Sequence, residues 1–313
     1  MRKKKGIAAA GNWIVDRVKV IDAWPAEERL ANVLSVTLGG GGGAHNVLID
    51  LARMKAPFPL LGIGYVGNDE DGRYLIEEAK ELKVDFSGIR VTLEHPTSFT
   101  DVMTVQSTGR RTFFHARGAN TLLEPGDIDP GDCKILHLAY LLLLDRIDPV
   151  APQVLSRIRA LGVKTSVDVV SETSERFMRV VYPALDHIDY LILNEIEAGE
   201  VSGHMIRRED GTYDLEELKA AARKLFRENL VVIHMPEGAF AVSKEHGELW
   251  VPSRPVKQIV SAVGAGDAFA AGMLYGLHEE WPLAQCMDLA HAAAGACLGH
   301  PTTTGGLRPI SEL

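Results

Sequence analysis

The chain has 313 residues, enough for one large α/β domain, and with 46% hydrophobic and 24% charged residues its composition is that of an ordinary globular protein. Its 33 Lys and Arg against 42 Asp and Glu leave a net charge of −9, which argues against a surface that binds nucleic acid or anionic lipid. The 3 cysteines show no CxxC spacing and so indicate neither a disulfide framework nor a zinc site. Because no apolar run is long enough to span a membrane, we expect a cytoplasmic protein.

Strand-length apolar runs alternate with segments of helical periodicity along most of the chain. This alternation predicts a mainly parallel α/β sheet flanked by helices. The helix that begins at Ala44 places Val47, Leu48 and Leu51 on one face. The expected core strands are residues 7–14, 59–66, 135–141, 164–169, 190–193 and 230–234.

Two segments, residues 17–38 and 90–117, break this alternation. Both are rich in Val, and the second is also rich in Thr and Phe and contains a turn at 107–110. We predict that they form a small β lid within a single domain that spans residues 1–313. Residues 203–213 indicate a surface insertion. The expected C-terminal helices are residues 265–278 and 283–298, which are rich in Ala and Gly.

A run of glycines at 39–43 leads into the helix that contains His45 and Asn46. Consecutive glycines cost backbone entropy but let a ligand approach the main chain closely, so the run favours a binding role over a purely structural one. The amide of Asn46 can bind a sugar hydroxyl. We interpret His45 as a surface or packing histidine, since no spacing typical of metal ligands accompanies it.

Residues 62–67 satisfy the pattern GxGxxG after a predicted strand, and Asp85 lies near the distance of a ribose-binding acid. Taken alone, this favours a dinucleotide-binding dehydrogenase. Carboxylates at 69–71, however, crowd the place where a pyrophosphate would bind, and one strand and helix have already passed. The dehydrogenase is therefore the weaker hypothesis. No GxxxxGK[ST] pattern occurs, which excludes a P-loop enzyme.

Asn194 and Glu197 follow a predicted core strand and lie on one side of a turn into a helix. Together they can orient a water bound to Mg²⁺ and a phosphate. A capping box with Asn194 as N-cap and Glu197 as N3 explains the same pair, and from spacing alone it is the better supported interpretation.

The strongest motif is Val-Gly-Ala-Gly-Asp-Ala-Phe at 263–269, in which small residues lead from an apolar run into a helix. Such a turn leaves backbone amides free at a helix N-terminus, where they can hold a phosphate or a transferring phosphoryl group. Asp267 then lies where it can accept a proton from a hydroxyl group. A plain N-terminal helix cap with a packing turn explains the motif equally well when it is taken alone.

Taken together and in this order, the glycine run ending in Asn46, the Asn194/Glu197 pair and the turn at 264–267 resemble the ribokinase-like (PfkB) carbohydrate kinase family. Residues 64–69 also resemble the GxVGxD turn of that family, which accounts for the GxGxxG string without a dinucleotide. The resemblance covers essentially the whole chain. It implies a doubly wound sheet with a β lid, a sugar bound between lid and sheet, and a homodimer formed through the lid.

The resemblance also assigns roles to single residues. The catalytic turn is matched by Gly264, Ala265, Gly266 and the base Asp267. The predicted substrate contacts are Asn12, Asp16, Gly41, Gly42 and Asn46. The predicted ATP contacts are Asn194, Glu197, His234, Gly238 and His291, and Glu197 acts on Mg²⁺ through water.

The chain departs from the family pattern at a few positions. Ser261 and Ala262 replace the Asp-Thr that usually precedes the catalytic turn, which removes one reason to expect activation by a monovalent cation. The turn at 234–238 has less glycine than is usual, and His291 stands where an Asn often faces the base. These departures leave the nucleotide preference open.

We therefore expect an ATP-dependent sugar kinase that uses Mg²⁺ and transfers the γ-phosphoryl group to a hydroxymethyl group of a small carbohydrate, such as a ribose-like or fructose-like sugar or a sugar acid. Two alternatives remain: a nucleoside kinase of the same family, and a non-catalytic sugar-binding protein with this fold. The sequence does not name the sugar.

Overall fold

The computed structural model describes residues 4–171 and 176–313. Its larger sheet has nine strands in the order β13-β12-β11-β10-β9-β8-β1-β4-β5. The seven strands from β11 to β5 are parallel, and β12 and β13 extend one edge as antiparallel strands. The strands are β1 (Ile7–Ala10), β4 (Leu60–Gly67), β5 (Asp85–Thr92), β8 (Ile135–Leu141), β9 (Lys164–Val169), β10 (Tyr190–Asn194), β11 (Leu230–Met235), β12 (Gly238–Ser243) and β13 (Gly247–Pro252).

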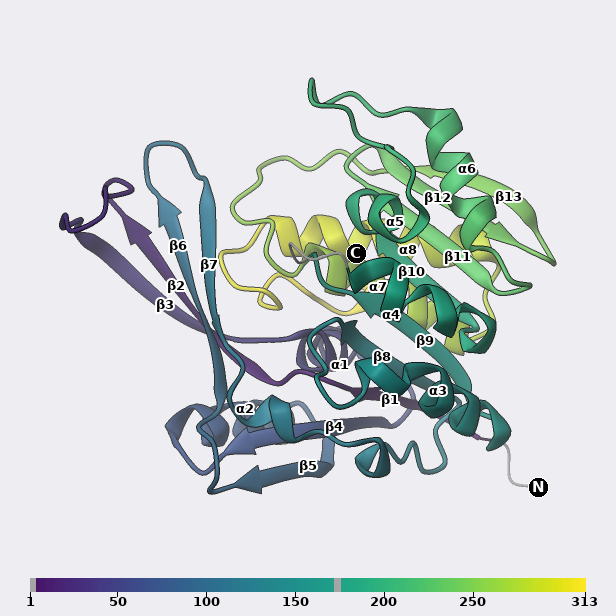
Figure 1. Cartoon of the computed structure of the whole chain (residues 1–313), viewed down its shortest axis with the longest axis horizontal. Helices are drawn as coiled ribbons and strands as arrows, with labels where there is room; N and C mark the ends of the chain where they lie inside the picture. Colours follow the sequence, from purple (N-terminus) through teal and green to yellow (C-terminus); the bar gives the residue numbers. More distant parts are fainter. Residues whose placement is uncertain (1–3, 172–175) are drawn as a thin grey trace.

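Helices cover both faces of this sheet, and each face has its own cluster of buried apolar side chains (Figure 1). One cluster includes α1 (Gly43–Arg53), α2 (Glu70–Glu81), α7 (Ala265–His278) and α8 (Leu283–Leu298). The other includes α3 (Ala151–Ala160), α4 (Arg176–Val180), α5 (Glu195–Ser202) and α6 (Leu215–Leu225). Short 3-10 helices lie at η1 (Gly118–Leu122), η2 (Pro125–Asp127), η3 (Asp148–Val150), η4 (Tyr182–His187) and η5 (Ile310–Glu312). The expected doubly wound α/β fold is confirmed.

A second sheet of four strands, in the order β3-β2-β6-β7, projects from the main body at the left of Figure 1. It is formed by β2 (Ile14–Ile21), β3 (Val33–Gly41), β6 (Ser98–Val105) and β7 (Arg111–Ala116), and we call it the lid. The chain enters it later than expected after α2, because Asp85–Thr92 pairs with β4 in the main sheet. The molecule thus has a small separate sheet beside its large one.

The expected strand at 7–14 is wrong at its end. β1 stops at Ala10, and Ile14 already begins the first strand of the lid. Gly11 separates the two strands with φ 144°, and a Cβ at this position would lie 2.6 Å from the carbonyl oxygen of Ala139. A single apolar run therefore supplies strands to both sheets, with a glycine at the change of direction.

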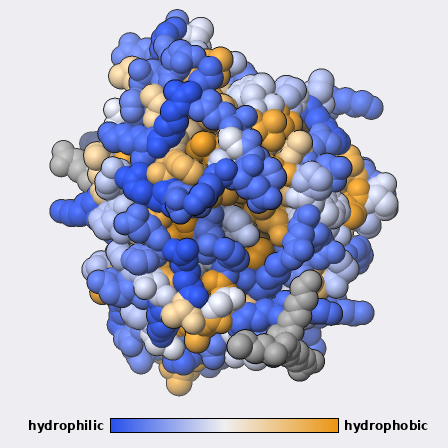
Figure 2. All heavy atoms as spheres, turned by 90° about the vertical axis from the view of Figure 1, so that its right-hand side faces the viewer, coloured by the Kyte–Doolittle hydropathy of each residue, from blue (hydrophilic) through white to orange (hydrophobic). Residues whose placement is uncertain are grey.

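The other expected core strands agree with the structure to within one residue at each end, and both C-terminal helices have the expected bounds. Residues 203–213 form the expected loop, with one isolated bridge between Arg207 and Tyr213. The end of the molecule remote from the lid presents mainly hydrophilic side chains with separate apolar areas (Figure 2). In the part of the chain that the structure describes, no helix is long and apolar enough to cross a membrane.

Packing against a tryptophan explains the first two glycines of the GxGxxG string. Trp13 is fully buried across β4, and its indole N–H donates to the carbonyl oxygen of Ile63 over 3.2 Å. A Cβ at Gly62 would lie 2.6 Å from this ring, and a Cβ at Gly64 would lie 2.4 Å from it. The two glycines therefore make room for the tryptophan that joins the end of β1 to the lid.

The substitution Gly64→Ala should destabilise the protein by about 1–3 kcal/mol, because the added methyl group overpacks a fully buried site. Denaturant unfolding monitored by tryptophan fluorescence measures this loss. Gly126→Ala is the matched control, since nothing lies within 4 Å of a Cβ there. Equal stability of the two variants would contradict this role for Trp13.

Candidate active site

The candidate site lies where the strand order of the main sheet changes direction. From β1 the chain moves outward to β4 and β5, and it later returns to β8 on the other side of β1 before moving out through β9 to β11. In doubly wound sheets, ligands bind at the carboxyl ends of the strands at such a switch point. The residues at this position are Asn12, just after β1, and Tyr140, near the end of β8.

The glycine run at the end of β3 packs tightly against this switch point. A Cβ at Gly41 would lie 2.3 Å from a carboxylate oxygen of Asp16, and one at Gly42 would lie 2.3 Å from the carbonyl oxygen of Asn12. A Cβ at Gly43 would lie 2.8 Å from the ring of Tyr140. These close contacts explain why glycine is needed at the three positions, a structural role that was not predicted from the sequence. They also place the start of α1 next to the site.

Asp267 lies in the first turn of α7 and contacts residues from two other elements. Its Oδ2 accepts hydrogen bonds from Nδ2 of Asn46 at 2.7 Å and from the hydroxyl group of Tyr140 at 3.0 Å. Among the described residues no donor contacts Oδ1. The helix begins after Gly264, whose φ of 82° favours glycine, and its first-turn amides have no acceptor within the helix. The Ala265 N–H donates to the carbonyl oxygen of Ala262 at 3.5 Å, whereas the N–H groups of Gly266 and Asp267 have no acceptor among the described residues. The carboxylate therefore lies beside unpaired amides.

Burial, and after it the nearby carboxylate of Asp168, raise the pKa of Asp267 to about 6, although the hydrogen bonds from Asn46 and Tyr140 act in the opposite direction. Burial also raises the pKa of Asp16 to about 7, with a contribution from Asp267. Both groups therefore change charge near neutral pH. Such a shift in a cleft is typical of residues that exchange protons with a ligand.

Asn12 is buried, and neither its amide nitrogen nor its amide oxygen has a hydrogen-bond partner among the described residues. A buried amide without partners costs free energy in the unliganded protein. Because Asn12 directly follows β1 at the switch point, a polar ligand bound there can satisfy it.

Three residues near Asp267 were not found by the sequence analysis. The backbone N–H of Tyr140 donates to Asp168 at 2.6 Å, and Nε2 of His137 lies 3.4 Å from the other oxygen of this carboxylate. His137 and Tyr140 lie on β8, and Asp168 lies on β9. Both strands were predicted from the sequence. The polar residues near their carboxyl ends could therefore have been recognised as candidate site residues.

His45 is a packing histidine, as interpreted, but its contacts have a direct consequence for the site. Its Nδ1 lies 3.1 Å from Oδ1 of Asn46, and its Nε2 lies 3.0 Å from a carboxylate oxygen of Glu78. Because Asn46 gives its NH₂ group to Asp267, its oxygen faces His45, and Nδ1 of His45 must be the donor. His45 therefore fixes the orientation of the amide.

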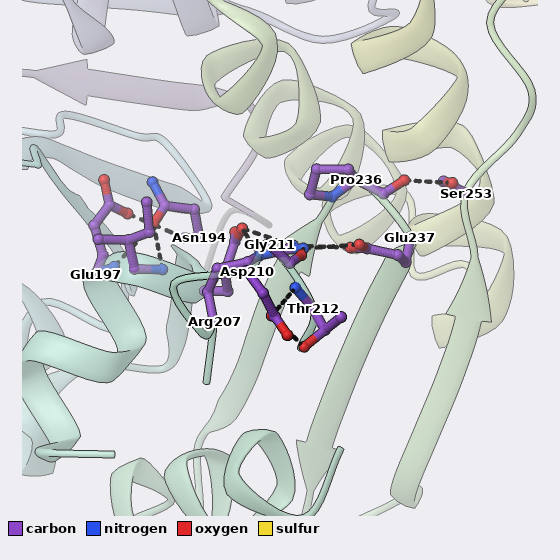
Figure 3. Close-up of polar contacts among 11 residues, drawn as sticks. Asn194, Glu197, Arg207, Asp210, Gly211, Thr212, Pro236, Glu237 and Ser253 are labelled. Carbon is purple, nitrogen blue, oxygen red and sulfur yellow. Dashed lines mark hydrogen bonds and ion pairs between the residues drawn. The ribbon is translucent and has the colours of Figure 1, made fainter. Parts of the chain in front are cut away.

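Asn194 and Glu197 form the capping box at the start of α5 (Figure 3). The Asn194 side chain accepts from the amides of Ile196 and Glu197, and the carboxyl group of Glu197 accepts from the amide of Asn194 at 3.1 Å and from Ser171 at 2.9 Å. Burial raises the pKa of Glu197 to about 8, and Asp168 and Asp267 contribute to this shift. Glu197 thus belongs to the helix cap and also interacts electrostatically with the carboxylates of Asp168 and Asp267.

Arg207 of the insertion connects two turns at this edge of the sheet (Figure 3). Its guanidinium group donates to both carboxylate oxygens of Glu237, at 2.8 and 2.9 Å, and to Glu195 at 2.9 Å. Glu195 begins α5 beside Asn194, and Glu237 lies in the turn between β11 and β12. One cation therefore holds together the two turns that the sequence analysis assigned to the nucleotide.

The structure brings His234 and His291 together around Phe269, in the second turn of α7. The His234 ring stacks on Phe269 with 4.6 Å between centroids, and His291 meets the same ring edge-on at 5.3 Å. A Cβ at Gly266 would lie 3.6 Å from His234. Gly238 packs against a different ring: a Cβ there would lie 2.6 Å from the ring of Trp250, so a side chain would not fit.

A buried carboxylate beside free helix amides, at the switch point of a doubly wound sheet with a β lid, is the arrangement of a small-molecule kinase. The sequence profile of the pfkB family carbohydrate kinases matches residues 9–309, and the chain belongs to this family. It is a phosphotransferase with a sugar alcohol group as acceptor.

Individual relatives agree with the family. The chain is 26% identical over 298 residues to a ribokinase of Arabidopsis thaliana, covering 93% of this chain and 76% of that protein. It is 24% identical over 336 residues to a 5-dehydro-2-deoxygluconokinase of Geobacillus kaustophilus, covering 100% and 93%. The solved structure of Arabidopsis thaliana ribokinase complexed with ribose and ATP has a TM-score of 0.81 at 22% identity and covers 98% of this chain and 97% of that one.

Replacing Tyr140 by Phe removes one donor to the ionised form of Asp267, so the pKa of Asp267 should rise above its present value of about 6. Carboxyl ¹³C chemical shifts followed as a function of pH measure this pKa. Tyr65→Phe is the control, because that hydroxyl group donates to Asp127 instead. A pKa of Asp267 that stays the same or falls in Tyr140→Phe would show that the hydroxyl group does not stabilise the carboxylate.

Proposed function

We propose that this protein is an ATP-dependent kinase that transfers the γ-phosphoryl group to a hydroxymethyl group of a small carbohydrate, with Asp267 as the base. The observation that carries this proposal is Oδ1 of Asp267, which has no donor among the described residues while Oδ2 is held by Asn46 and Tyr140. The carboxylate is fixed on one side and open to a hydroxyl group on the other. A general base needs this geometry.

In the proposed reaction the O–H bond of the acceptor breaks and its proton moves to Asp267. The acceptor oxygen forms a bond to the γ-phosphorus, the bond from that phosphorus to the β,γ-bridging oxygen breaks, and ADP leaves with the electron pair. The backbone amides of the turn that begins with Gly264, Ala265 and Gly266 are proposed to hold the negative charge of the group in transfer. Asp267 must be ionised to act, so turnover should fall as the pH drops through about 6.

The sugar is proposed to bind between the lid and the switch point. Support comes from the unpartnered amide of Asn12, from Asp16 on the lid, and from Gly41 and Gly42, whose lack of side chains lets the chain pack closely beside both residues. Asp16 and Asn12 offer acceptors and donors to vicinal hydroxyl groups. Asn46 serves the same ligand by orienting Asp267.

ATP is proposed to lie along the carboxyl edge from α5 to α7, near Asn194, His234 and His291. The metal arrives with the nucleotide as MgATP, so it is part of the substrate. Among the described residues no three His, Cys, Asp or Glu side chains are grouped to hold a metal by themselves. The mutual repulsion of Asp168, Glu197 and Asp267 nevertheless suits a cation, and Glu197 would act on it through water. When bound, the metal neutralises charge on the phosphates.

Two further assignments are part of this proposal. We propose a homodimer through the lid face opposite Asp16, where Val36, Leu38 and Phe114 are each about half exposed and Trp24 stacks on Phe114. We also propose a cytoplasmic location, which the buried free thiols of Cys133, Cys286 and Cys297 suit.

Asp267→Asn tests the central assignment. It keeps the size of the side chain but removes the base, so kcat should fall by roughly 10²- to 10⁴-fold while sugar and ATP still bind. ADP release over a panel of pentoses, hexoses, sugar acids and nucleosides measures turnover, and calorimetry measures binding. Asp71→Asn, at a carboxylate that pairs with Arg17 outside the site, is the control. Turnover of Asp267→Asn within a few-fold of the wild type would exclude Asp267 as the base.

Arg207→Ala tests the nucleotide side. Without the guanidinium group, Glu195 and Glu237 repel each other and the two turns separate, so KM for ATP should rise several-fold with little change of kcat at saturating ATP. Arg208→Ala is the matched control, because the neighbouring arginine is exposed and pairs with Asp214, away from the two turns. An unchanged KM for ATP would mean that these turns do not contact the nucleotide.

A further inference from the structure

Arg111 lies at the start of β7 on the side of the lid that faces the site. The strand register pairs Asp16 with Thr100 and Thr100 with His115. Because alternate residues of a strand share a face, Phe113 and Arg111 lie on the same face as His115 and hence as Asp16. The arginine and the aspartate therefore lie on the same face of the lid, four residues apart along the register.

The side chain of Arg111 reaches from the lid to the loop that leads into the catalytic turn. Its Nη1 lies 3.4 Å from the hydroxyl oxygen of Ser261, which also accepts from the backbone N–H of Val263 at 3.3 Å. Val263 lines a crevice together with Asp16 and Val18 of the lid. Gly264 follows directly and caps the helix that carries Asp267.

Three other cations of the lid region have an acidic partner, and Arg111 has none in the part of the chain that the structure describes. Arg17 pairs with Asp71, Lys19 with Asp101, and Arg117 with Asp145. Among the described residues no carboxylate pairs with Arg111, and burial alone lowers its pKa. Within residues 4–171 and 176–313, Ser261 is the one acceptor found for this guanidinium group, so most of its five N–H donors have no acceptor there.

A second polar group beside Arg111 also lacks a partner. Thr104 lies directly opposite Arg111 on β6, so the two side chains are neighbours on one face. The hydroxyl oxygen of Thr104 is buried and has no hydrogen-bond partner among the described residues. A half-buried cation and an unsatisfied hydroxyl group side by side are costly unless a ligand completes them.

We propose that Arg111 and Thr104 form a binding site for an oxyanion, a phosphoryl or carboxylate group that belongs to one of the two substrates. A guanidinium group matches such groups with paired, charge-assisted hydrogen bonds. The inference rests on the proposed kinase function and adds a residue outside the motifs found in the sequence. The oxyanion is either the phosphoryl group in transfer, held beside the amides of α7, or an acidic substituent of the sugar.

The experiment compares the full-length wild type with Arg111→Ala, Arg111→Lys and Arg110→Ala. Arg110 is the matched control, because it is the exposed residue next to Arg111 and precedes β7. ADP release is measured with neutral sugars, sugar acids and sugar phosphates, and calorimetry measures the binding of a non-hydrolysable ATP analogue and of each sugar acid. We expect Arg111→Ala to lose roughly 100-fold in kcat/KM, with partial recovery in Arg111→Lys and none of this loss in Arg110→Ala.

Comparing the different acceptors and the ATP analogue distinguishes the two possible sources of the oxyanion. A loss with every acceptor, together with weaker binding of the ATP analogue, assigns the site to the phosphoryl group. A loss confined to sugar acids or sugar phosphates, with unchanged binding of the analogue, assigns it to the sugar.

Values of kcat/KM and binding constants of Arg111→Ala within two-fold of the wild type for all ligands overturn the inference. If the wild-type protein phosphorylates none of the acceptors, the proposed function is wrong instead. The calorimetric comparison then still decides the oxyanion site, because it needs no turnover.

Discussion

The hydrogen bond from Asn46 to Asp267 joins the first turns of two helices whose residues are 221 positions apart in the chain. It is buried, and its direction is fixed. The oxygen of the Asn46 amide faces His45, whose other nitrogen contacts Glu78, and Glu78 in turn pairs with Arg53. A flipped amide would turn its oxygen toward a carboxylate and its NH₂ toward a donor. The orientation of Asp267, and with it the free oxygen offered to a ligand, therefore depends on a chain of contacts that ends at the surface of α1 and α2.

The site concentrates negative charge where little water reaches it. Burial raises the pKa of Asp16, Asp267 and Glu197 above their ordinary values, to about 7, 6 and 8. A carboxyl group whose pKa is higher in the folded than in the unfolded chain stabilises the fold when it is protonated, and this contribution is lost as the pH rises through the folded value. Between about pH 4 and 8 the empty site thus becomes progressively less favourable. A cation and a proton-donating alcohol relieve that repulsion, so the charge that weakens the fold also favours binding of the substrates.

The elements predicted best from the sequence are those whose stability is local. The two C-terminal helices and most core strands had clear periodicity, and the turn at 264–267 carried its own glycines. Tyr140, Asp168 and His137 were missed because each depends on which strands become neighbours, and that order is set by the whole sheet. The same limit explains the strand expected at 7–14, where only the contact of Gly11 with Ala139 shows that the chain leaves one sheet for another. The GxGxxG string was set aside correctly, but its cause, the indole of Trp13, lies in a distant segment.

The short segment from Gly11 to Asp16 links the lid to the chemistry. Within it Asn12 ends the main sheet, Trp13 is wedged against β4 and also meets His45 edge-on at 5.4 Å, and Ile14 begins the lid. The connection between the main sheet and the lid is therefore tightly packed on this side, because the residue that precedes the first lid strand is fully buried. Trp13 contacts His45, and His45 contacts the Asn46 amide that orients Asp267, so a continuous series of packed side chains joins the base of the lid to the site. The proposed sugar contact at Asp16 is therefore connected, through the packed side chains of Trp13 and His45, to the amide that orients the proposed base.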